Sequence, residues 1–322
     1  MNVYKFFDEI PVTTEKVILA IGKFDGVHKG HNAVLEKIFE KCKIREGRPW
    51  ILTFSRTPAE FFQKGKKHLR LMTLEHKLYM LEKKGIDTVI LIDFSEKFAN
   101  INADVFVNLL RNKILNFDLV VGFDFRLGKN SAMDAEALRQ KGYESNFTVD
   151  IVPPFIANSL KISSTRIKAL IVEGEIEEAN EYLEKPYSIE GKVTSRDNKG
   201  KVIGYPTANI NNSEVVYPKE GVYLSGFQIA KKTEEGLYPE FDEKIFFGMT
   251  YVGKSSLTGT KAPSTIETHI FDFNKNIYGE TVRVLFYRRI RNSIKFKSYE
   301  ELKNQLAIDK VHCLKLIENW RS

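Results

Sequence analysis

The sequence of 322 residues is 43% hydrophobic and 28% charged, which is typical of an ordinary soluble globular protein with room for two cores. It has no run of about 18 apolar residues and no basic-then-apolar start, so we expect neither a membrane span nor a signal peptide. The net charge is +7, but residues 1–184 hold 27 Lys and Arg against 26 Asp and Glu, whereas residues 185–322 hold 22 against 16. The excess is therefore local and does not by itself indicate a nucleic-acid-binding protein.

The first predicted element is a buried strand, Val17–Ile21, followed by a glycine-rich turn and a helix over Gly30–Lys43. His28 and His31 lie in this turn, where glycines let the backbone approach a ligand. A helix start offers free N–H groups to an anion, and imidazoles there can donate to phosphate oxygens during phosphoryl or nucleotidyl transfer. Turn or capping roles are the alternative. The pattern predicts a nucleotide site.

Strand-length apolar runs then alternate with amphipathic helices as far as residue 152. We predict further strands at Trp50–Phe54, Thr88–Ile92, Leu119–Gly122 and Thr148–Val152, and further helices at Thr73–Lys84, Asn102–Leu115 and Met133–Lys141. This alternation predicts an α/β fold with a parallel sheet that helices cover on both faces. Ligands of such sheets bind beyond the carboxyl ends of the strands, where the histidine turn also lies.

Three more stretches follow strand ends and should share that edge. They are Thr53–Glu60, with Pro58 ending the strand; Gly122–Gly128, which offers Asp124 and Arg126 to a ligand; and Lys161–Lys168. In the last, Ser163 or Ser164 can cap a helix whose start could bind phosphate, with donors from Thr165, Arg166 and Lys168. Helix capping alone is the alternative for this serine pair.

The segment Gly22-Lys-Phe-Asp-Gly-Val-His-Lys-Gly-His31 resembles the signature of the nucleotidyltransferase superfamily, in the form that bacterial FAD synthetases use. The resemblance implies a Rossmann-like domain in which His28 and His31 are catalytic and Asp124 and Arg126 contact the flavin. It also implies a set of residues that bind ATP and its phosphates: Gly22, Phe24, Asp25, Gly26, Gly30, Ser164, Thr165, Arg166 and Lys168. Two departures are Lys168, where the family usually has Arg, and Arg56-Thr57-Pro58 in place of F-x-P-x-P.

The pattern changes after an acidic helix near Gly174–Glu184, which Pro186 follows, so we predict domains at residues 1–184 and 185–322. Strands without intervening helices predict an antiparallel sheet or small barrel. These strands are Tyr187–Thr194, Val222–Ile229, Lys244–Val252, Ser264–Phe273 and Thr281–Arg288, and a final helix covers Tyr299–Trp320. Basic residues gather at Arg283, Arg288, Arg289, Arg291, Lys295 and Lys297. A solvated face, a site for phosphorylated small molecules and an RNA-binding patch are the three interpretations.

One stretch of this half, Gly191–Ile210, predicts a second site. Gly200 and Gly204 flank a flexible loop, and Pro206 precedes Thr207 and Asn209. Two short oxygen-bearing side chains two residues apart lie on one side of an extended segment, where they can hold a magnesium ion on nucleotide phosphates. A simple turn is the alternative.

This stretch resembles the riboflavin kinase signature G-x-x-x-G-[RK]-x-[LI]-G-[FY]-P-T-A-N. The resemblance implies that Thr207 and Asn209 bind Mg²⁺, that Gly200 and Gly204 belong to the ATP-binding loop, and that Glu267 is the general base. It also assigns flavin or nucleotide binding to Arg291. The departures are Tyr251 where the family has Asn, and Asn292 and Ser293 where acidic residues often follow the last arginine.

The two resemblances together identify the chain as similar to the bifunctional riboflavin kinase/FMN adenylyltransferases, from about Val17 to Asp309. They imply riboflavin, FMN, FAD and ATP as ligands, Mg²⁺ as cofactor, a cytoplasmic monomer or weak oligomer, and no nucleic-acid or membrane partner. Cys42 and Cys313 fit this compartment as free thiols. The alternatives are a nucleotidyltransferase for a pantetheine or nicotinate nucleotide, an enzyme with one decayed half, and a flavin-responsive or RNA-binding regulator.

Overall fold

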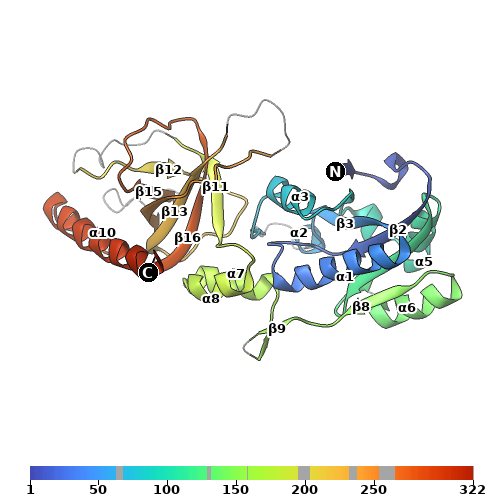
Figure 1. The fold of residues 1–322 in the computed structure, drawn as a ribbon. Coiled ribbons are helices and arrows are strands. Elements are labelled where there is room, and N and C mark those ends of the chain that lie inside the picture. The colour runs from blue at the N-terminus through green and yellow to red at the C-terminus, as the bar shows by residue number, and fades with distance from the viewer. Residues whose placement is uncertain are drawn as a thin grey trace. The chain divides into compact units, whose positions relative to one another are not determined.

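The computed structural model describes residues 1–62, 68–128, 132–157, 159–194, 204–231, 238–253 and 265–321. The chain forms two compact units, Met1–His68 with Thr73–Ser164, and Leu69–Met72 with Thr165–Ser322 (Figure 1). This division differs from the boundary predicted after residue 184, because α8 (Ile176–Tyr182) packs against β16 (Thr281–Asn292) of the second unit. No helix in the described part of the chain is long and apolar enough to cross a membrane.

The first unit is built on a parallel sheet of six strands in the order β1-β4-β3-β2-β5-β8. The strands are β1 (Asn2–Tyr4), β2 (Thr13–Ile21), β3 (Arg48–Arg56), β4 (Thr88–Asp93), β5 (Ile114–Gly122) and β8 (Val149–Val152). The chain steps outward from β2 to β3 and β4, and then returns to the other side of β2 at β5. The carboxyl ends of β2 and β5 therefore flank the crevice where such sheets bind ligands, as the sequence predicts.

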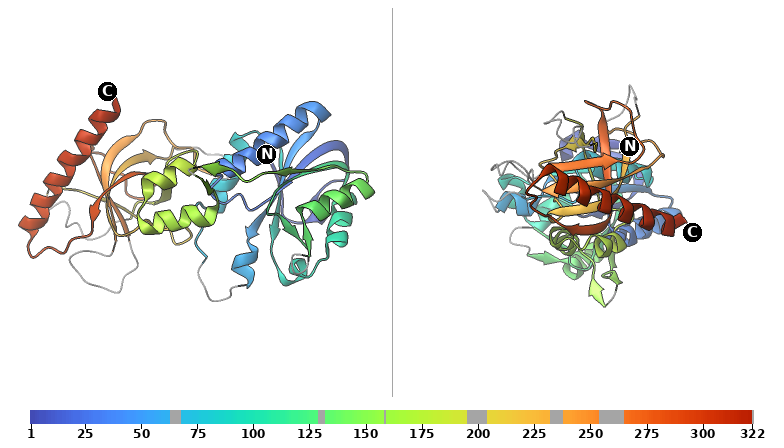
Figure 2. Two further views of the ribbon diagram at one scale, coloured as in Figure 1. Left: turned by 90° about the horizontal axis from the view of Figure 1, so that it is seen from below. Right: turned by 90° about the vertical axis from the view of Figure 1, so that its left-hand side faces the viewer.

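Helices cover both faces of this sheet (Figures 1 and 2). They are α1 (Lys29–Arg45), α3 (Leu74–Lys83), α5 (Ala103–Arg111) and α6 (Ala135–Glu144), with the short α2 (Pro58–Phe62), α4 (Glu96–Ala99) and η1 (Phe7–Glu9) between elements. One face of the sheet forms a continuous core with α5 and α6, through residues such as Leu19, Leu110 and Leu138. Because side chains alternate along a strand, Ile18 and Ala20 point to the opposite face.

Most predicted elements of this unit are confirmed, and Thr73 caps α3 as expected by accepting a hydrogen bond from the His76 N–H. The helix predicted over Asn102–Leu115 is wrong at its end. It stops at Arg111, and the buried Ile114 already begins β5, since its side chain is needed in the sheet core. The edge strand β1 was not predicted, and neither were the two-residue pairs β6 (Arg126–Leu127) with β7 (Met133–Asp134) and β9 (Ile156–Ala157) with β10 (Leu160–Lys161).

The second unit is an antiparallel barrel in the strand order β11-β16-β13-β14-β15-β12. Its other strands are β11 (Ser188–Lys192), β12 (Ala208–Ile210), β13 (Gly221–Ile229), β14 (Phe246–Gly253) and β15 (Thr265–Ile270). A bridge between Thr194 and Asn209 joins the two end strands and closes the ring. The predicted barrel is thus confirmed; its short strand β12, which carries Asn209, was not predicted.

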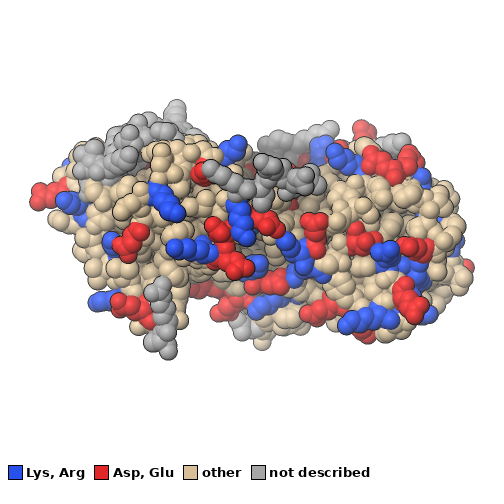
Figure 3. Space-filling model, turned by 45° about the horizontal axis from the view of Figure 1, so that its top comes forward, with Lys and Arg blue, Asp and Glu red and all other residues tan. Residues whose placement is uncertain are grey.

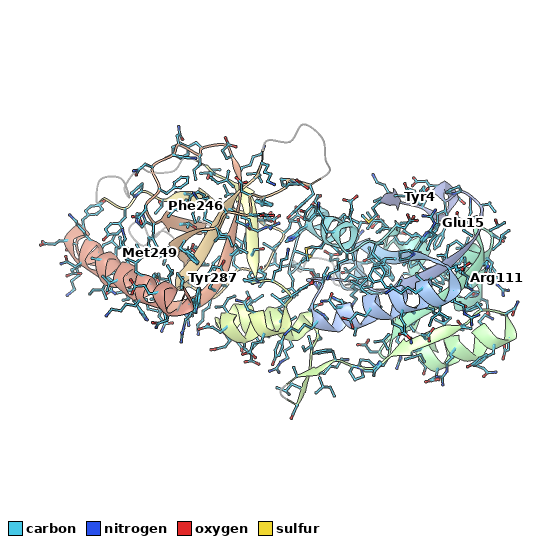
Figure 4. The ribbon with its side chains drawn as sticks, in the orientation of Figure 1. Tyr4, Glu15, Arg111, Phe246, Met249 and Tyr287 are labelled. Atoms are coloured by element: carbon cyan, nitrogen blue, oxygen red, sulfur yellow. The ribbon has the colours of Figure 1, made fainter. Side chains whose placement is uncertain are left out.

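The barrel has two different faces. Inside, the fully buried hydroxyls of Ser225, Thr250 and Thr268 bond one another across three strands, at 2.6 and 2.8 Å. Outside, the terminal helix α10 (Tyr299–Arg321) packs against β14 and β16 (Figure 2). Its Cys313 and Ile317 share a core with strand residues that include Met249 and Tyr287 (Figure 4). The outer face next to α10 is also where the second site lies.

Candidate functional sites

The histidine turn between β2 and α1 has a strained backbone. Phe24 and Val27 have φ values of 51° and 37°, in the region that only glycine adopts without cost. Gly26, which lies between them, has a φ of 89°. Both non-glycine side chains are buried, at 1% and 0% exposure, so packing maintains this conformation. Such strain is typical of sites where a backbone must present particular groups to a ligand.

Two glycines give the rings of this turn their space. A Cβ atom on Gly30 would lie 3.2 Å from the His28 imidazole, and one on Gly22 would lie 3.0 Å from the Phe24 ring. His28 is the N-cap residue of α1, yet its side chain makes no capping hydrogen bond. The imidazole therefore lies at the helix start without serving as its cap.

The imidazoles of His28 and His31 stack, with centroids 3.7 Å apart and planes 18° apart. Burial lowers the pKa of His28 to about 4, although Asp25 acts in the opposite direction. Burial also holds the pKa of His31 well below its usual value, and the charges of His28 and Lys77 add to that effect. Among the described residues, neither Nδ1 atom has a hydrogen-bond partner. At neutral pH the pair is thus two uncharged imidazoles with hydrogen-bonding capacity to spare.

The Lys161–Lys168 stretch joins the turn through Ser164. Its Oγ donates to the Asp25 carbonyl at 2.9 Å, and α7 (Ser164–Glu173) begins there. The next residues of this stretch differ: Arg166 donates to Glu178 Oε1 at 2.8 Å, which raises the pKa of Arg166, and Thr165 is exposed. Lys168 is half-buried. The phosphate-binding roles of Thr165, Arg166 and Lys168 stay predictions.

The Gly122–Gly128 turn places its two charged side chains differently. Asp124 forms an ion pair with Lys161 at 2.9 Å, and the Lys161 ammonium lies 4.0 Å from the centroid of the Phe123 ring. Arg126 is exposed and donates to the neighbouring Phe125 carbonyl. An aromatic ring and a cation at the end of β5 are suited to a planar anionic ligand. Lys161 and Phe123 lie within stretches that the sequence analysis places at this edge, but neither was assigned a role there.

The second site is a row of residues that lie side by side on neighbouring strands of the barrel. The strand register pairs Asn209 with Glu267, Glu267 with Tyr251, Tyr251 with Val222, and Val222 with Arg291. Directly opposed residues of antiparallel strands project on the same face. Five strands far apart in the sequence thus place the predicted metal ligand, the predicted base and the predicted flavin-binding arginine in one row.

Asn209 has the features of a cation ligand. It is 8% exposed, and its Oδ1 has no hydrogen-bond partner among the described residues. Its amide nitrogen is 3.5 Å from Thr207 Oγ1, so the two predicted ligands are neighbours. His269 Nδ1 lies 2.9 Å from the Pro206 carbonyl oxygen and fixes the segment before them. A buried amide oxygen beside a hydroxyl fits Mg²⁺, which prefers oxygen ligands and takes few from the protein.

The other members of the row are held by specific contacts. Thr265 Oγ1 donates to Glu267 Oε1 at 3.2 Å, and the Tyr251 hydroxyl is 3.0 Å from Ser293 Oγ. Tyr251 and Ser293 are both departures from the kinase pattern, and the structure joins them by this bond. Of the two predicted loop glycines, Gly204 has a φ of 84°, while Gly200 lies outside the described residues.

Arg291 binds within the protein. Its Nε and Nη2 donate to the buried Asp309 of α10 at 2.9 and 2.8 Å, so the arginine anchors that helix beside the row. Its role in flavin or nucleotide binding stays a prediction. Asp309 was not singled out in the sequence, although a carboxylate on the core side of an amphipathic helix is a usable signal.

Several arginines of the basic cluster Arg283–Lys297 bond within the protein, whereas Lys295 and Lys297 are exposed, and the interpretation as a solvated face is wrong for Arg283. Arg283 forms a buried ion pair with Glu190 at 2.9 Å, and Arg288 pairs with Glu177 at 3.1 Å. Arg289 donates to the Glu220 carbonyl and to Asn292. On the surface in Figure 3, basic and acidic side chains are interspersed. The cluster therefore gives no support to an RNA-binding interpretation.

Comparisons with known proteins match both halves. A sequence model of FAD synthetase matches residues 10–166, and one of riboflavin kinase matches residues 183–317. The bifunctional riboflavin kinase/FMN adenylyltransferase of Haemophilus influenzae is 36% identical over 293 residues, covering 90% of this chain and 91% of that protein. The Listeria monocytogenes protein of the same name is 33% identical and covers 93% of both chains. A solved structure described as a macrolide-efflux protein from Streptococcus pneumoniae is 31% identical, with a TM-score of 0.83 and 96% of each chain covered.

Proposed function

The chain belongs to the family of bifunctional riboflavin kinase/FMN adenylyltransferases, and we propose that it makes FAD from riboflavin in two ATP-dependent steps. The barrel phosphorylates riboflavin to FMN, and the α/β domain transfers AMP from ATP to FMN with release of pyrophosphate. The observation that supports both steps is the presence of two separate residue groups, the stacked histidines in one half and the Asn209–Glu267 pair in the other. A pantetheine or nicotinate nucleotide enzyme would not need the second.

In the barrel, Glu267 is proposed to accept the proton of the ribityl hydroxyl as that oxygen attacks the γ-phosphate of ATP. Its contact with Thr265 orients the carboxylate, and its cross-strand neighbour Asn209 stands beside it. Thr207 and Asn209 would hold Mg²⁺, which neutralises charge on the transferred phosphoryl group when bound. Gly200 and Gly204 are proposed for the loop over the nucleotide, and Arg291 for the flavin side.

In the α/β domain, the FMN phosphate attacks the α-phosphate of ATP directly, so no protein nucleophile is required if the substrates are aligned. His28 and His31 would donate hydrogen bonds to phosphate oxygens as charge develops there. Because both are neutral in the free protein, they act as preorganised donors, and the negative charge of a bound triphosphate would favour their protonation. The backbone of Gly22–Gly30 would approach the nucleotide. The phosphates would be bound by Ser164, Thr165, Arg166 and Lys168, and the flavin would be bound by Asp124 and Arg126.

We further propose the domain limits 1–184 and 185–322, a cytoplasmic location, and a monomer or weak oligomer with no nucleic-acid or membrane partner. The matched regions, 10–166 and 183–317, are compatible with those limits. On the face shown in Figure 3, acidic and basic side chains are interspersed.

Product analysis tests the proposal. Purified protein is incubated with Mg·ATP and either riboflavin or FMN, and the flavins are separated by chromatography. We expect FAD from both substrates, with FMN appearing first from riboflavin. FMN alone from riboflavin would mean that the α/β site is inactive, and FAD from FMN only would place the fault in the barrel. Absence of any product, with flavin still bound, would favour a regulator.

A further inference from the structure

Lys77 is a buried lysine close to the histidine turn, and no motif includes it. It lies in α3, between Leu74, Leu78 and Leu81 on the apolar side of that helix, and is 6% exposed. Its ammonium donates to the Lys23 carbonyl at 3.3 Å, to Thr53 Oγ1 at 3.0 Å and to the Phe54 carbonyl at 2.9 Å, among other contacts. A buried charge is costly unless it is well bonded, so such a position needs a reason.

The three oxygens lie where β2 and β3 end, at the edge of the sheet that carries the site. Lys23 is the residue directly before the strained Phe24, so a bond to its carbonyl fixes the peptide plane that sets the φ of Phe24. Thr53, with no exposed surface, donates to the same carbonyl at 3.0 Å. The Phe24 ring lies 5.1 Å from that of His31. Lys77 is thereby linked to His31 through Lys23 and Phe24.

The charge of Lys77 acts on the same histidine. Burial is the main cause of the lowered pKa of His31, and the charges of His28 and Lys77 lower it further, while Asp25 acts on His28 in the opposite sense.

We propose that Lys77 is a positioning residue for FMN adenylylation, which fixes the turn that presents His28 and His31 through its hydrogen bonds. This proposal rests on the proposed adenylyltransferase function of the domain. It assigns a role in the first site to α3, a helix of the connection between β3 and β4. It also distinguishes Lys77 from a lysine that only stabilises the fold.

Lys41 provides the matched control. It is likewise buried, at 9% exposure, but its ammonium binds Asp118, Asp150 and Thr148, which belong to β5 and to the amino-terminal side of β8. This network holds α1 against the sheet and includes none of the residues of the histidine turn. Substitution of Lys41 therefore reports the effect of losing a buried lysine without disturbing that turn.

The experiment compares Lys77→Met, Lys77→Arg and Lys41→Met in the full chain. We measure kcat and KM for FAD formation from FMN, with riboflavin phosphorylation by the barrel as an internal control. For Lys77→Met we expect kcat for adenylylation to fall about 10-fold, as the loss of preorganisation can cause, with riboflavin phosphorylation unchanged. For Lys77→Arg, which keeps the charge, we expect partial recovery, and for Lys41→Met a lower urea midpoint but an unchanged kcat per folded molecule.

A second readout follows the titration of His31 by NMR in protein with labelled histidine, with the signal assigned by its loss in His31→Asn. We expect the pKa of His31 to rise in Lys77→Met and to stay in place in Lys41→Met. Wild-type kcat and an unmoved His31 titration in Lys77→Met would overturn the proposal. If that variant does not fold, Thr53→Val tests the proposal instead, since it removes the hydroxyl that bonds both Lys77 and the Lys23 carbonyl. A drop in kcat of about 3-fold supports the proposal, as expected for one hydrogen bond, and an unchanged kcat overturns it.

Failure of the proposed function gives a different result. In that case the wild-type protein itself forms no FAD from FMN, and no variant comparison arises. If the wild type forms FAD and Lys77→Met forms it equally fast, the adenylyltransferase function stands and only the role of Lys77 is wrong.

Discussion

The two sites of this chain are built in different ways. The histidine site depends on a turn between β2 and α1, in which Phe24 and Val27 have backbone conformations that the surrounding packing must enforce. The barrel site depends on regular strand pairing, which sets Asn209, Glu267 and Tyr251 side by side without any unusual dihedral angle. The histidine site should therefore be sensitive to loss of the contacts that hold its turn. The barrel site should tolerate loss of a single side-chain contact, because strand pairing holds its residues in place.

The sites also differ in charge. The histidines are neutral because burial opposes their protonation, so they gain charge only when an anionic ligand arrives. The barrel site offers oxygen atoms instead: a carboxylate, an unpartnered amide oxygen among the described residues, and a hydroxyl. Oxygens suit a metal ion and a proton acceptor, and neutral imidazoles suit phosphate oxygens.

The largest effect should come from Glu267→Gln, which keeps the shape of the side chain and removes its basicity. We expect riboflavin phosphorylation to fall about 1,000-fold, within the range for loss of a general base. FAD formation from FMN should remain at the wild-type rate, because that reaction belongs to the other domain. Glu243→Gln, an exposed carboxylate of the same half, is the control. Equal activity of the two variants would remove Glu267 from the mechanism.

The next effect concerns how the free energy of unfolding depends on pH at the histidine site. The folded-state pKa of His28, about 4, lies below the value near 6.5 of an unfolded chain. Above pH 6.5 both states are neutral and stability is complete. As the pH falls, the unfolded chain binds a proton first, so stability declines down to about pH 4, by up to ~3 kcal/mol for this group.

Urea unfolding can follow this change with the fluorescence of Trp50, which is buried in the first unit. The only other tryptophan, Trp320, is half-exposed in α10 and is removed as Trp320→Phe. In that background, His28→Asn should flatten the decline between pH 6.5 and pH 4. An identical pH dependence with and without His28 would show that this residue is not buried in its neutral form.

Substitution of His28 by Ala should then reduce FAD formation at least about 100-fold, as the loss of one preorganised donor can. FMN formation from riboflavin should be intact. His312→Ala is the matched control, because His312 is exposed on α10 and belongs to neither site. Normal FAD production by His28→Ala would refute the catalytic role and, with it, the view that the strained turn serves the chemistry.

The residues found from the sequence and those missed differ in how local their signal is. His28, His31, Thr207 and Asn209 belong to short motifs that a strand end or a turn makes visible, and their placement agrees with the structure. The strand pairings that unite Asn209, Glu267 and Tyr251 connect distant segments. The hydrophobic pattern and the turns constrain the register of a strand but do not say which distant strand is its neighbour, so the sequence could name these residues without showing that they form one row.

Lys77 and Asp309 were missed for a related reason. Each is a charged residue on the buried side of a helix, where its partner is known only once the fold brings Lys23 or Arg291 close. A charge within an apolar stripe is nevertheless a detectable irregularity, and both examples turn out to be bonded near a site. The end of α5 was mispredicted because Ile114 fits a helix stripe and a buried strand equally well.

The smallest effect should come from the hydrogen bond between Tyr251 and Ser293, which joins the two departures from the kinase pattern. Tyr251→Phe and Ser293→Ala each remove this bond and keep the packing of the aromatic ring. We expect kcat/KM for riboflavin to fall about 3-fold in either variant, the size of one hydrogen bond in partly wet surroundings. The double variant should be no worse than the single ones, since both substitutions remove the same bond.

This double-mutant cycle distinguishes the two kinds of site most directly. If the register alone places Glu267, then Tyr251 affects only how the riboflavin site is lined, and the change should appear mainly in KM. A fall in kcat of more than about 30-fold would mean that the Tyr251 hydroxyl itself orients the base, since one net hydrogen bond is worth less than that. In that event one side-chain contact, and not strand pairing alone, would orient Glu267. The barrel site would then depend on individual contacts as the histidine turn does, and the difference between the two sites would not hold.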